Sequence, residues 1–581
     1  MFLKVFKRIL QCIDRGISLV LKLCVAMIVV LIVYLSIPAT ITPLTTPHIL
    51  HLQLSGKAVE NHHVKSSLFD FVDDSAPIRN FTLVRIQKVL DLVSQDPYIK
   101  GIYLDLQRVQ GLGFSSAVRL HRMLLNFQKE TGKEVWTWGE NYTQAQYLVA
   151  SAAKHIGLHP LGSVQMKGFS MGTLYWGDFL KKWGIDVSVY KAGDFKNAPE
   201  PFTNARPSKD SLQMQKRILD TYAQQYQDTV MLARSLTGTA IASYFSWLRE
   251  IPGGLSLAEK QKELQWVTDI AWKKDFEAKM LERMMIADGS VISWLDYLTM
   301  YDHSNMRERA PIAVISIEGR MIQSSLSRGF SVDAVLQQMD LLEKSSTTQV
   351  VIVRVNSPGG DVFIAERLRQ GLLALQKAGK KVVISMGDYA ASGGYWIATA
   401  SDYIVAEPGT LTGSIGVFSL KPSVAPLLEK WNIGVGGYKT NDLARMDGFV
   451  TKPSEMEKHL QQHQVETIYR YFLSLVSQAR HMSLQEVDRI AQGQVWLGVQ
   501  AKDLGLVDAL GGLEDTLTWV KQEYHLDAQA PVWYVPLVEQ SFLENLIMQV
   551  GGQIQVLWNN MIEMWENKQN TSLNTVKRLL W

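Results

Sequence analysis

The sequence predicts an α/β protein made of two similar domains in tandem, each with a largely parallel sheet. The chain has 581 residues, which is more than a single hydrophobic core usually organises. Short apolar runs rich in β-branched residues alternate with amphipathic patterns of helical period, as in a sheet covered by helices. Sections of the first half of the chain also recur in the second half.

The repeat relates the two halves at a nearly constant offset. Gly139–Ile156 matches Gly387–Ile404, with glycine, tyrosine, alanine and isoleucine in register 248 residues apart. Val189–Lys196 matches Gly437–Ala444 at the same offset. The strand-like segment that begins at Ile49 resembles the one at Ile312, with a small insertion or deletion between the copies. The repeat therefore indicates a duplicated domain.

The repeat predicts domains over residues 46–300 and 311–535. Within the second copy, the β-branched run Val350–Val355 predicts a strand, Ala365–Gln376 a helix and Lys381–Met386 another strand. Nearly continuous hydrophobicity is typical of parallel strands buried on both faces. Residues 208–298 are mostly helical by periodicity, with a break near Pro252, and residues 301–311 predict a linker.

Residues 1–45 predict a short cytoplasmic tail and a single transmembrane helix. Residues 17–37 are apolar with few interruptions, and about 20 residues at 1.5 Å each match a hydrocarbon core of roughly 30 Å. Basic residues gather before this run, which places the N-terminus inside and the body outside the cytosol. A cleaved signal peptide is the alternative, although Pro38 and its neighbours make a poor cleavage site.

The composition excludes several classes of function. Hydrophobic residues make up 47% and charged residues 20%, as in an ordinary globular protein. The formal net charge of +3 is too small for this length to indicate a nucleic-acid partner. The two cysteines, Cys12 and Cys24, both lie near the N-terminus, so the body can hold neither a disulfide nor a cysteine-ligated metal.

No metal or organic cofactor is expected from the motifs of the sequence. It contains no HExxH, no GxxxxGK[ST] and no GxGxxG pattern. One GxSxG match occurs at Gly168–Gly172, where an α/β-hydrolase would carry its nucleophile. No clear strand precedes Ser170, and short patterns of this kind arise by chance.

The segment Tyr389–Trp396 (YAASGGYW) carries the strongest chemical signal. Ser392 follows a predicted strand and is flanked by alanine and glycine, which let a substrate backbone approach its hydroxyl. A helix that starts here offers free N–H groups to a developing oxyanion. An N-cap serine in a tight turn is the alternative. The glycine turn Asn356–Gly360 ends the preceding strand, so both turns are expected at one edge of the sheet.

These motifs resemble the SppA family of signal peptide peptidases. The segments NSPGG, AASGGYW and TLTGSIGVF occur in the family's order, and the duplication and anchor resemble its double-length bacterial type. The resemblance implies tandem ClpP/crotonase-like spirals of ββα units, and a Ser/Lys catalytic pair. The family's serine corresponds to Ser392. Its lysine lies in a G-x-x-K-[SN]-A-x-E-P-F pattern, which corresponds to Gly193–Phe202 and assigns the general base to Lys196.

The two copies carry complementary halves of this pair. In the repeat Ser392 aligns with Gln144 and Lys196 aligns with Ala444, so neither copy is competent alone. The two domains, or two neighbouring subunits, must therefore share one cleft. Lysine has a pKa near 10.4, and burial has to lower it to about 7 for the amine to accept the serine proton.

Other residues are expected to support the catalytic pair. Ser414 is expected to orient the Lys196 amine by resemblance to the family, or else to stabilise a turn. The backbone N–H groups of Gly359, Gly360 and Gly393 are candidates for the oxyanion site.

The resemblance also implies the setting. Expected substrates are apolar peptides such as residual signal peptides, at the outer face of the bacterial inner membrane, with the body in the periplasm. A homo-oligomer, a tetramer by family analogy, is expected. Residues 539–581 predict either a packing helix pair or an interfacial amphipathic segment. A crotonase-like acyl-CoA enzyme and a non-catalytic membrane scaffold are the alternative functions.

Overall fold

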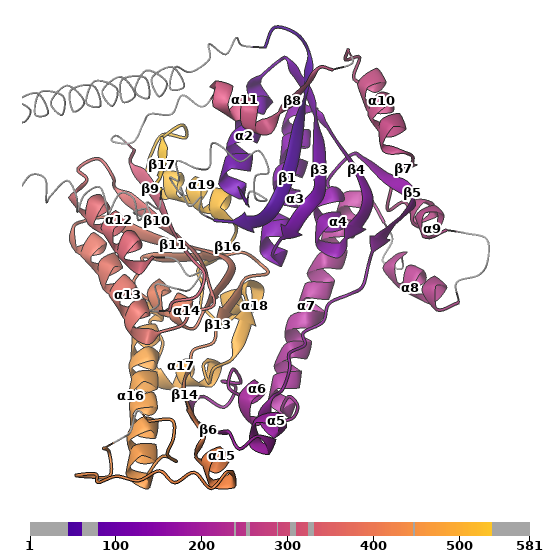
Figure 1. Ribbon diagram of the computed structural model, residues 1–581. Coiled ribbons are helices and arrows are strands. Elements are labelled where there is room, and N and C mark those ends of the chain that lie inside the picture. The colour runs from indigo at the N-terminus through magenta and orange to yellow at the C-terminus, as the bar shows by residue number, and fades with distance from the viewer. Residues whose placement is uncertain are drawn as a thin grey trace, which may run out of the picture.

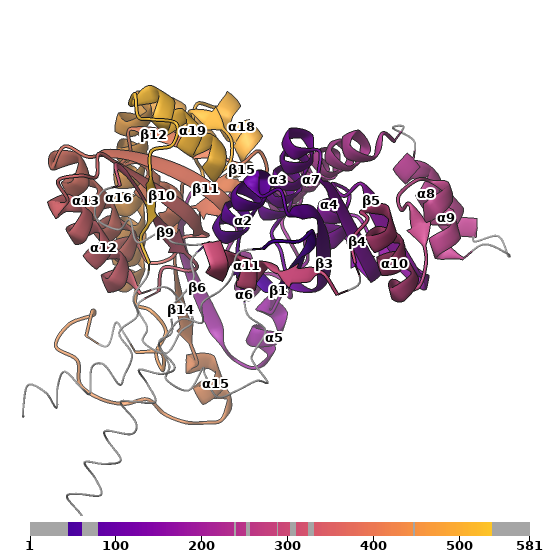
Figure 2. The same cartoon turned by 90° about the horizontal axis from the view of Figure 1, so that it is seen from above.

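The computed structural model shows an α/β protein in which two sheets lie side by side (Figures 1 and 2). It describes residues 44–60, 80–236, 240–250, 256–287, 289–301, 310–322, 331–444 and 448–536. We call residues 44–301 the first half and residues 310–536 the second half. The predicted anchor within residues 1–45 and the segment 539–581 lie outside the described residues, apart from residues 44 and 45. Among the described residues no helix is long and apolar enough to cross a membrane.

The first half contains a seven-stranded parallel sheet. Its order is β2-β1-β3-β4-β5-β7, with β8 paired to β1. Its strands are β1 (His48–Val59), β2 (Phe81–Thr82), β3 (Ile99–Gly111), β4 (Glu134–Thr143), β5 (His155–Gln165), β7 (Asp269–Ile270) and β8 (Val291–Ser293).

Helices pack on this sheet through apolar stripes, and the region from residue 208 onward is mostly helical, as predicted. They are α2 (Leu83–Gln95), α3 (Phe114–Thr131), α4 (Gln144–Ala150), α7 (Lys209–Arg234), α8 (Ala240–Glu250), α9 (Leu257–Glu263), α10 (Lys273–Arg283) and α11 (Trp294–Tyr301). The short helices α5 (Gly177–Lys182) and α6 (Glu200–Thr203) lie away from the sheet, near the far end of α7 (Figure 1).

The second half contains an eight-stranded sheet that is parallel except at one edge pair. Its order is β15-β13-β11-β10-β9-β17, with β12 joining β11 to β16, and β13 and β15 run antiparallel. Its strands are β9 (Ile312–Glu318), β10 (Val350–Ser357), β11 (Lys381–Ala391), β12 (Tyr403–Ala406), β13 (Leu411–Gly413), β15 (Val495–Leu497), β16 (Ala509–Leu510) and β17 (Val532–Tyr534). All six residues from Val350 to Val355 are buried, which confirms the prediction for that run.

The helices of the second half cover this sheet around its main core. They are α12 (Val332–Lys344), α13 (Val362–Lys377), α14 (Gly393–Ala398), α15 (Ala425–Lys430), α16 (Glu455–Arg480), α17 (Leu484–Ile490), α18 (Gly498–Asp503) and α19 (Leu513–Glu523). The predicted strand–helix–strand order is therefore present, and β11 runs five residues beyond the predicted end at Met386.

The strand register confirms the duplication. In the first half Asn141 pairs with Ser163 and Thr143 with Gln165. In the second half the residues 248 positions later form the same pairs, from Tyr389 with Leu411 to Ala391 with Gly413. The copies are thus superimposable residue by residue at this edge of each sheet.

A two-stranded arm joins the halves away from the sheets. β6 (Asp186–Ala192) of the first half pairs antiparallel with β14 (Val417–Ser423) of the second half, over seven residue pairs. The long helices α7 and α16 run down toward this arm from their own sheets (Figure 1). The sequence match of β6 with Gly437–Ala444 does not extend to structure, because residues 433–439 form neither helix nor strand.

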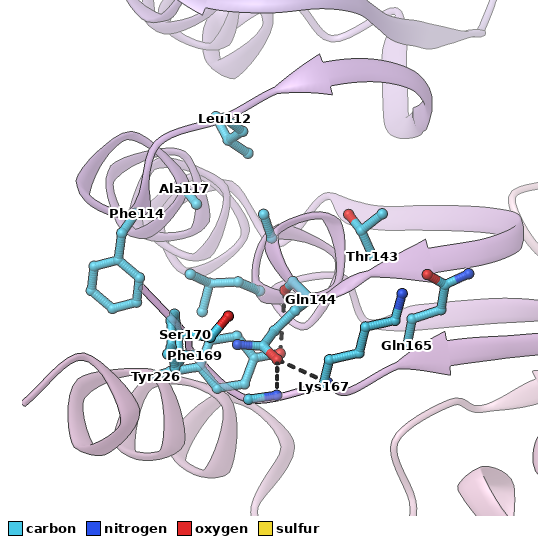
Figure 3. Close-up of a pocket in the computed structure, with 13 residues that line it drawn as sticks. Leu112, Phe114, Ala117, Thr143, Gln144, Gln165, Lys167, Phe169, Ser170 and Tyr226 are labelled. Atoms are coloured by element: carbon cyan, nitrogen blue, oxygen red, sulfur yellow. Dashed lines mark hydrogen bonds between the residues drawn. The ribbon is translucent and has the colours of Figure 1, made fainter. Parts of the chain in front are cut away.

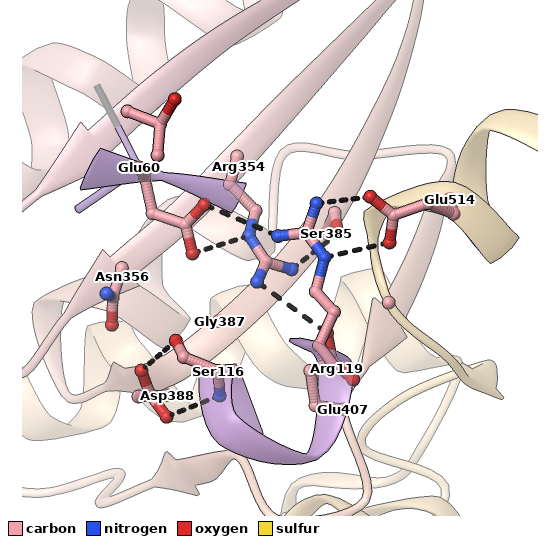
Figure 4. A network of polar contacts seen from close by, with 12 residues as sticks. Glu60, Ser116, Arg119, Arg354, Asn356, Ser385, Gly387, Asp388, Glu407 and Glu514 are labelled. Atoms are coloured by element: carbon pink, nitrogen blue, oxygen red, sulfur yellow. Dashed lines mark hydrogen bonds and ion pairs between the residues drawn. The ribbon is translucent and has the colours of Figure 1, made fainter. Parts of the chain in front are cut away.

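Buried charges also hold the halves together (Figure 4). The Arg354 Nε donates to Glu60 Oε1 at 3.0 Å, and Arg119 forms an ion pair with Glu514. Each pair joins one residue of the first half to one of the second half. The two arginines are at most 1% exposed, so their charges require these partners.

Candidate active site

Lys196, Ser392 and Ser414 meet at the junction of the two halves. The Lys196 Nζ lies 3.2 Å from Ser392 Oγ. It also lies 2.9 Å from Ser414 Oγ and 2.8 Å from the Ser414 carbonyl oxygen. The three residues that the sequence singled out, from three separate motifs and two different copies, therefore meet at the Lys196 amine within one chain.

Strand β11 and helix α14 position Ser392 between them. The backbone leaves β11 at Ala391, turns at Ser392 and enters α14 at Gly393. Ser392 has φ 54° and ψ −116°, a backbone conformation that residues other than glycine rarely adopt and that costs about 1–3 kcal/mol. Its N–H donates to the Gly413 carbonyl at 2.8 Å, which fixes the turn against β13.

The β6–β14 arm positions Lys196 opposite Ser414. Ala192 at the end of β6 pairs with Val417 at the start of β14. Lys196 follows Ala192 by four residues, and Ser414 precedes Val417 by three. The register of the arm therefore sets the amine of the first half against the hydroxyl and carbonyl of the second half.

The loop Ala491–Gln494 holds both sides of the site together, and sequence reasoning missed it. The Gln492 carbonyl accepts from Phe195 N–H at 2.8 Å, and Gly493 N–H donates to the Ile415 carbonyl at 2.7 Å. Gly493 has φ +76°, and a Cβ there would lie 2.6 Å from the Lys196 backbone nitrogen. The glycine of this Gln-Gly-Gln segment was the one available signal.

Burial controls the charge of Lys196. The residue is 5% exposed, and burial lowers the pKa of its amine to about 7. The neighbouring carboxylate of Glu200 turns away, since its Oε2 accepts from Ser208 N–H and Ser211 Oγ–H. The amine is thus surrounded by neutral oxygens and no carboxylate opposes the shift.

The contacts of the amine are compatible with its neutral form. A neutral lysine amine has two N–H donors and one lone pair, whereas the charged form has three donors and no acceptor. The two donors fit the Ser414 carbonyl and Oγ, and the lone pair then accepts from the Ser392 hydroxyl. This arrangement can remove the Ser392 proton.

The glycine turn at the end of β10 reaches the same place. A Cβ at Gly359, which has φ +88°, would lie 2.5 Å from the Gly393 nitrogen and 3.0 Å from Ser392 Cβ. The Gly359 N–H already donates to Ser357 Oγ at 3.1 Å. Within the described part of the chain, the Gly360 and Gly393 N–H groups have no hydrogen-bond partner.

Comparison with known proteins identifies the family. The model of "Peptidase family S49" matches residues 127–247 and 374–527. "Protease 4" of Haemophilus influenzae is 32% identical over 501 residues, covering 83% of this chain and 80% of that protein. The chain belongs to peptidase family S49. As a member of this family and a relative of that protease, the chain is a serine protease.

Other relatives extend the match of this S49 peptidase. "Protease 4" of Salmonella typhi is 32% identical over 552 residues, covering 91% of this chain and 86% of that protein. A "Putative signal peptide peptidase SppA" of Enterococcus faecium is 32% identical over 263 residues, covering 44% of this chain and 76% of that protein. Among solved structures, "ClpP1 from Listeria monocytogenes" has a TM-score of 0.23 and 18% identity, covering 35% of this chain and 94% of that chain.

Proposed function

We propose that this S49 peptidase cleaves peptide bonds with Ser392 as nucleophile and Lys196 as general base. The observation that carries the proposal is the 3.2 Å contact between Lys196 Nζ and Ser392 Oγ, in a buried setting where the pKa of the amine is about 7. A hydroxyl beside a neutral amine can transfer its proton as the oxygen attacks a carbonyl carbon.

The reaction proceeds in two steps. Lys196 takes the Ser392 proton while Oγ bonds to the scissile carbonyl carbon, and the resulting ammonium returns the proton to the leaving amine as the C–N bond breaks. Water then attacks the ester, with Lys196 again accepting the proton, and the acid is released with Ser392 regenerated. Ser414 orients the amine throughout.

Two of the three candidate backbone N–H groups form the oxyanion site in this proposal. The N–H groups of Gly360 and Gly393 are free to stabilise the negative oxygen of the tetrahedral intermediate. The Gly359 N–H is committed to Ser357 Oγ, so we assign Gly359 the role of letting the two turns approach closely.

The proposed substrates are residual signal peptides and similar apolar peptides. The SppA resemblance and the name of the Enterococcus faecium relative support this substrate class. We further propose that the two halves are ClpP/crotonase-like spirals and that residues 17–37 anchor the chain in the bacterial inner membrane, with the N-terminus in the cytoplasm and the body in the periplasm. The apolar run and the preceding basic residues support the anchor.

We also propose that the chain forms a homo-oligomer. Within one chain, β6 of the first half pairs with β14 of the second half. The repeat counterparts of these strands, residues 434–440 and 169–175, form no strand, and most of their residues are exposed. If residues 434–440 of one copy pair with residues 169–175 of the next, the same contact repeats head to tail and generates a ring when it closes.

Covalent labelling tests the catalytic proposal. A serine-directed acylating probe is expected to modify Ser392, as located by peptide mass mapping, and Lys196→Ala is expected to abolish labelling. Ser392→Ala and Lys196→Ala should each lower kcat about a thousandfold or more with folding retained. The matched control is Lys191→Ala, because Lys191 is an exposed lysine of β6, five residues before Lys196.

Two results would refute the catalytic proposal. Unchanged peptide hydrolysis in both variants would favour a scaffold with a non-functional pair. Turnover of acyl-CoA thioesters in place of peptides would favour a crotonase-like enzyme.

A further inference from the structure

The first half contains a cavity that the catalytic proposal does not use (Figure 3). Its volume is about 420 Å³, within the range of roughly 300–1,000 Å³ that ligand sites occupy. Its walls come from the end of β3, the start of α3, the start of α4, the end of β5 and helix α7. Lys167 is the one lining residue that is charged at neutral pH, and the walls are otherwise apolar or neutral.

The cavity is the repeat counterpart of the active site. Gln144 in its floor stands 248 residues before Ser392, and Ala145 stands 248 residues before Gly393. The identical pairing register of β4–β5 and β11–β13 shows that this correspondence is structural.

The chemistry of cleavage has been lost at this counterpart. Gln144 has no hydroxyl, and its Oε1 accepts from the Lys167 and Gly168 N–H groups, which holds the loop beside the cavity. The repeat counterpart of the base is Ala444, which has no amine. The repeat counterparts of the catalytic pair therefore supply neither a nucleophile nor a base, so we expect a peptide bound here to stay intact.

The walls are preorganised by aromatic contacts. Phe169 packs against Phe114 and Tyr226 with ring centroids 5.8 and 5.7 Å apart. The Tyr226 hydroxyl donates to the Gln144 carbonyl at 3.2 Å. An apolar side chain can therefore enter without first ordering the walls, which lowers the entropic cost of binding.

Packed residues connect one wall of the cavity to the catalytic side of the molecule. Phe114 packs against Gly409, since a Cβ at Gly409 would lie 2.7 Å from its ring, and the Tyr222 hydroxyl donates to the Gly409 carbonyl at 2.9 Å. Gly409 leads directly into β13, which ends at Gly413, the residue that accepts from the Ser392 N–H. One wall of the cavity is therefore linked to the turn at Ser392 by direct contacts.

We propose that this cavity is a second, non-cleaving binding site for the apolar peptides that the enzyme cuts. It takes an apolar side chain of an extended segment while another segment of the same peptide occupies Ser392. This inference rests on the proposed function, since it assigns the peptide the same ligand chemistry at both sites. Its effect is to raise the local concentration of long peptides at the catalytic site.

The binding test uses the Ser392→Ala enzyme, so that the probe survives. Two fluorescent Leu/Ala-rich peptides are used. The peptide of about four residues measures the number of binding sites, and the peptide of about twenty residues, which extends over roughly 65 Å, serves in the activity test. Short Leu/Ala-rich peptides of about four residues should bind with two per chain. Adding Ala145→Trp, which fills the cavity, should reduce this number to one, and Ala145→Leu provides a smaller filler if the tryptophan variant does not fold. Leu161→Trp is the matched control, because the Leu161 side chain on β5 is exposed. This variant should still bind two peptides per chain.

The activity test uses the enzyme with Ser392 intact. Ala145→Trp should lower kcat/KM for the long peptide about tenfold relative to kcat/KM for a short ester. The change should come mainly from a higher KM, because only the long peptide can occupy both sites at once. Leu161→Trp should leave the ratio unchanged. One peptide per chain before any cavity substitution, or a ratio unaffected by Ala145→Trp, would overturn the inference.

Two further outcomes separate this inference from its alternatives. If Ala145→Trp changes the mass in analytical ultracentrifugation and leaves peptide binding unchanged, a second copy of the chain fills the cavity and the inference is wrong. Failure of the catalytic proposal has a different signature, which is peptide hydrolysis that persists in Ser392→Ala. The binding stoichiometry reports on the cavity in either case.

Discussion

At the residue scale, the site depends on one amine that is kept uncharged. Three oxygens surround Lys196 Nζ, and all belong to neutral groups of Ser392 and Ser414. Burial alone lowers the pKa of the amine to about 7, so the neutral form that the proposed mechanism needs is available near neutral pH. The sequence predicted Ser392 from the small residues around it, whereas Lys196 and Ser414 were predicted from the resemblance to the SppA family.

The pH dependence of the rate follows from this pKa. Lys196 accepts the Ser392 proton only when neutral, so kcat/KM should fall about tenfold for each pH unit below 7 and level off above it. Steady-state rates from pH 5 to 9 measure this profile. A rate that is flat through pH 7 in this range would show that another group acts as the base.

Ser414 should act as a positioning residue whose loss changes both rate and pH profile. Ser414→Ala removes the acceptor at 2.9 Å but keeps the carbonyl at 2.8 Å. One hydrogen bond to this amine is worth about 1.5–3 kcal/mol in its charged form, so kcat should fall about 10- to 100-fold. Loss of an acceptor also disfavours the charged amine, which should move the acid limb of the profile to lower pH.

A purely structural role of Ser414 would leave that limb in place. The comparison is therefore made on the position of the limb and not on the rate alone, with thermal melting as the check on folding. An unshifted limb together with a lowered melting temperature would contradict the positioning role.

At the element scale, the loop Ala491–Gln494 shows what sequence reasoning could not find. Most of its contacts use backbone carbonyl and N–H groups, which leave no residue-type signature, and the Gln492 side chain adds one contact by accepting from the Asp194 N–H at 3.2 Å. Their placement depends on Phe195 and Ile415, which are distant in sequence. The same reason explains residues 433–439, which match β6 in sequence but form no strand because strand formation depends on a partner.

Gly493→Ala should inactivate the enzyme through this loop. The added Cβ would lie 2.6 Å from the Lys196 nitrogen at φ +76°, so the segment carrying the base has to move. A displacement of about 1 Å at a catalytic group costs about 100-fold in rate. Gly379→Ala is the matched control, because Gly379 has φ +83° and nothing within 4 Å.

The control separates backbone strain from the clash. Gly379→Ala should lower stability by about 1 kcal/mol and keep full kcat. Equal kcat for the two variants, normalised to folded protein, would show that the clash at Gly493 is absorbed without moving Lys196.

At the scale of the whole molecule, a buried charge network couples the halves. Two arginines, Arg119 and Arg354, face the carboxylates of Glu60, Glu407 and Glu514 (Figure 4). The Glu407 carboxylate is 3.7 Å from Arg354 and is the most distantly paired of the three. Burial raises the pKa of Glu407 to about 7, so the network nears charge balance when Glu407 holds a proton.

Glu407→Gln should therefore stabilise the protein at alkaline pH. Because the folded pKa of about 7 exceeds the usual 4.5, the stabilising contribution of protonated Glu407 is full below pH 4.5 and is lost as the pH rises through 7. At pH 8 the glutamine variant should gain up to about 3 kcal/mol in free energy of unfolding, with a smaller gain at pH 5.

Urea unfolding of the full chain at both pH values measures this difference. Glu429→Gln is the control, because Glu429 is a surface residue whose side chain is 66% exposed. A stability of Glu407→Gln below that of the unsubstituted protein at pH 8 would show that the ionised carboxylate stabilises the network.

The 196 residues that separate Lys196 from Ser392 also bear on synthesis of the protein. A ribosome that adds about 5–20 residues per second needs roughly 10–40 s to pass from the codon for the lysine to that for the serine. During this interval the nascent chain carries a base with no nucleophile, and the completed chain gains its chemistry only when the second half docks through β14. On the proposed mechanism, an unfinished copy of the enzyme therefore cannot cleave other proteins during its own synthesis.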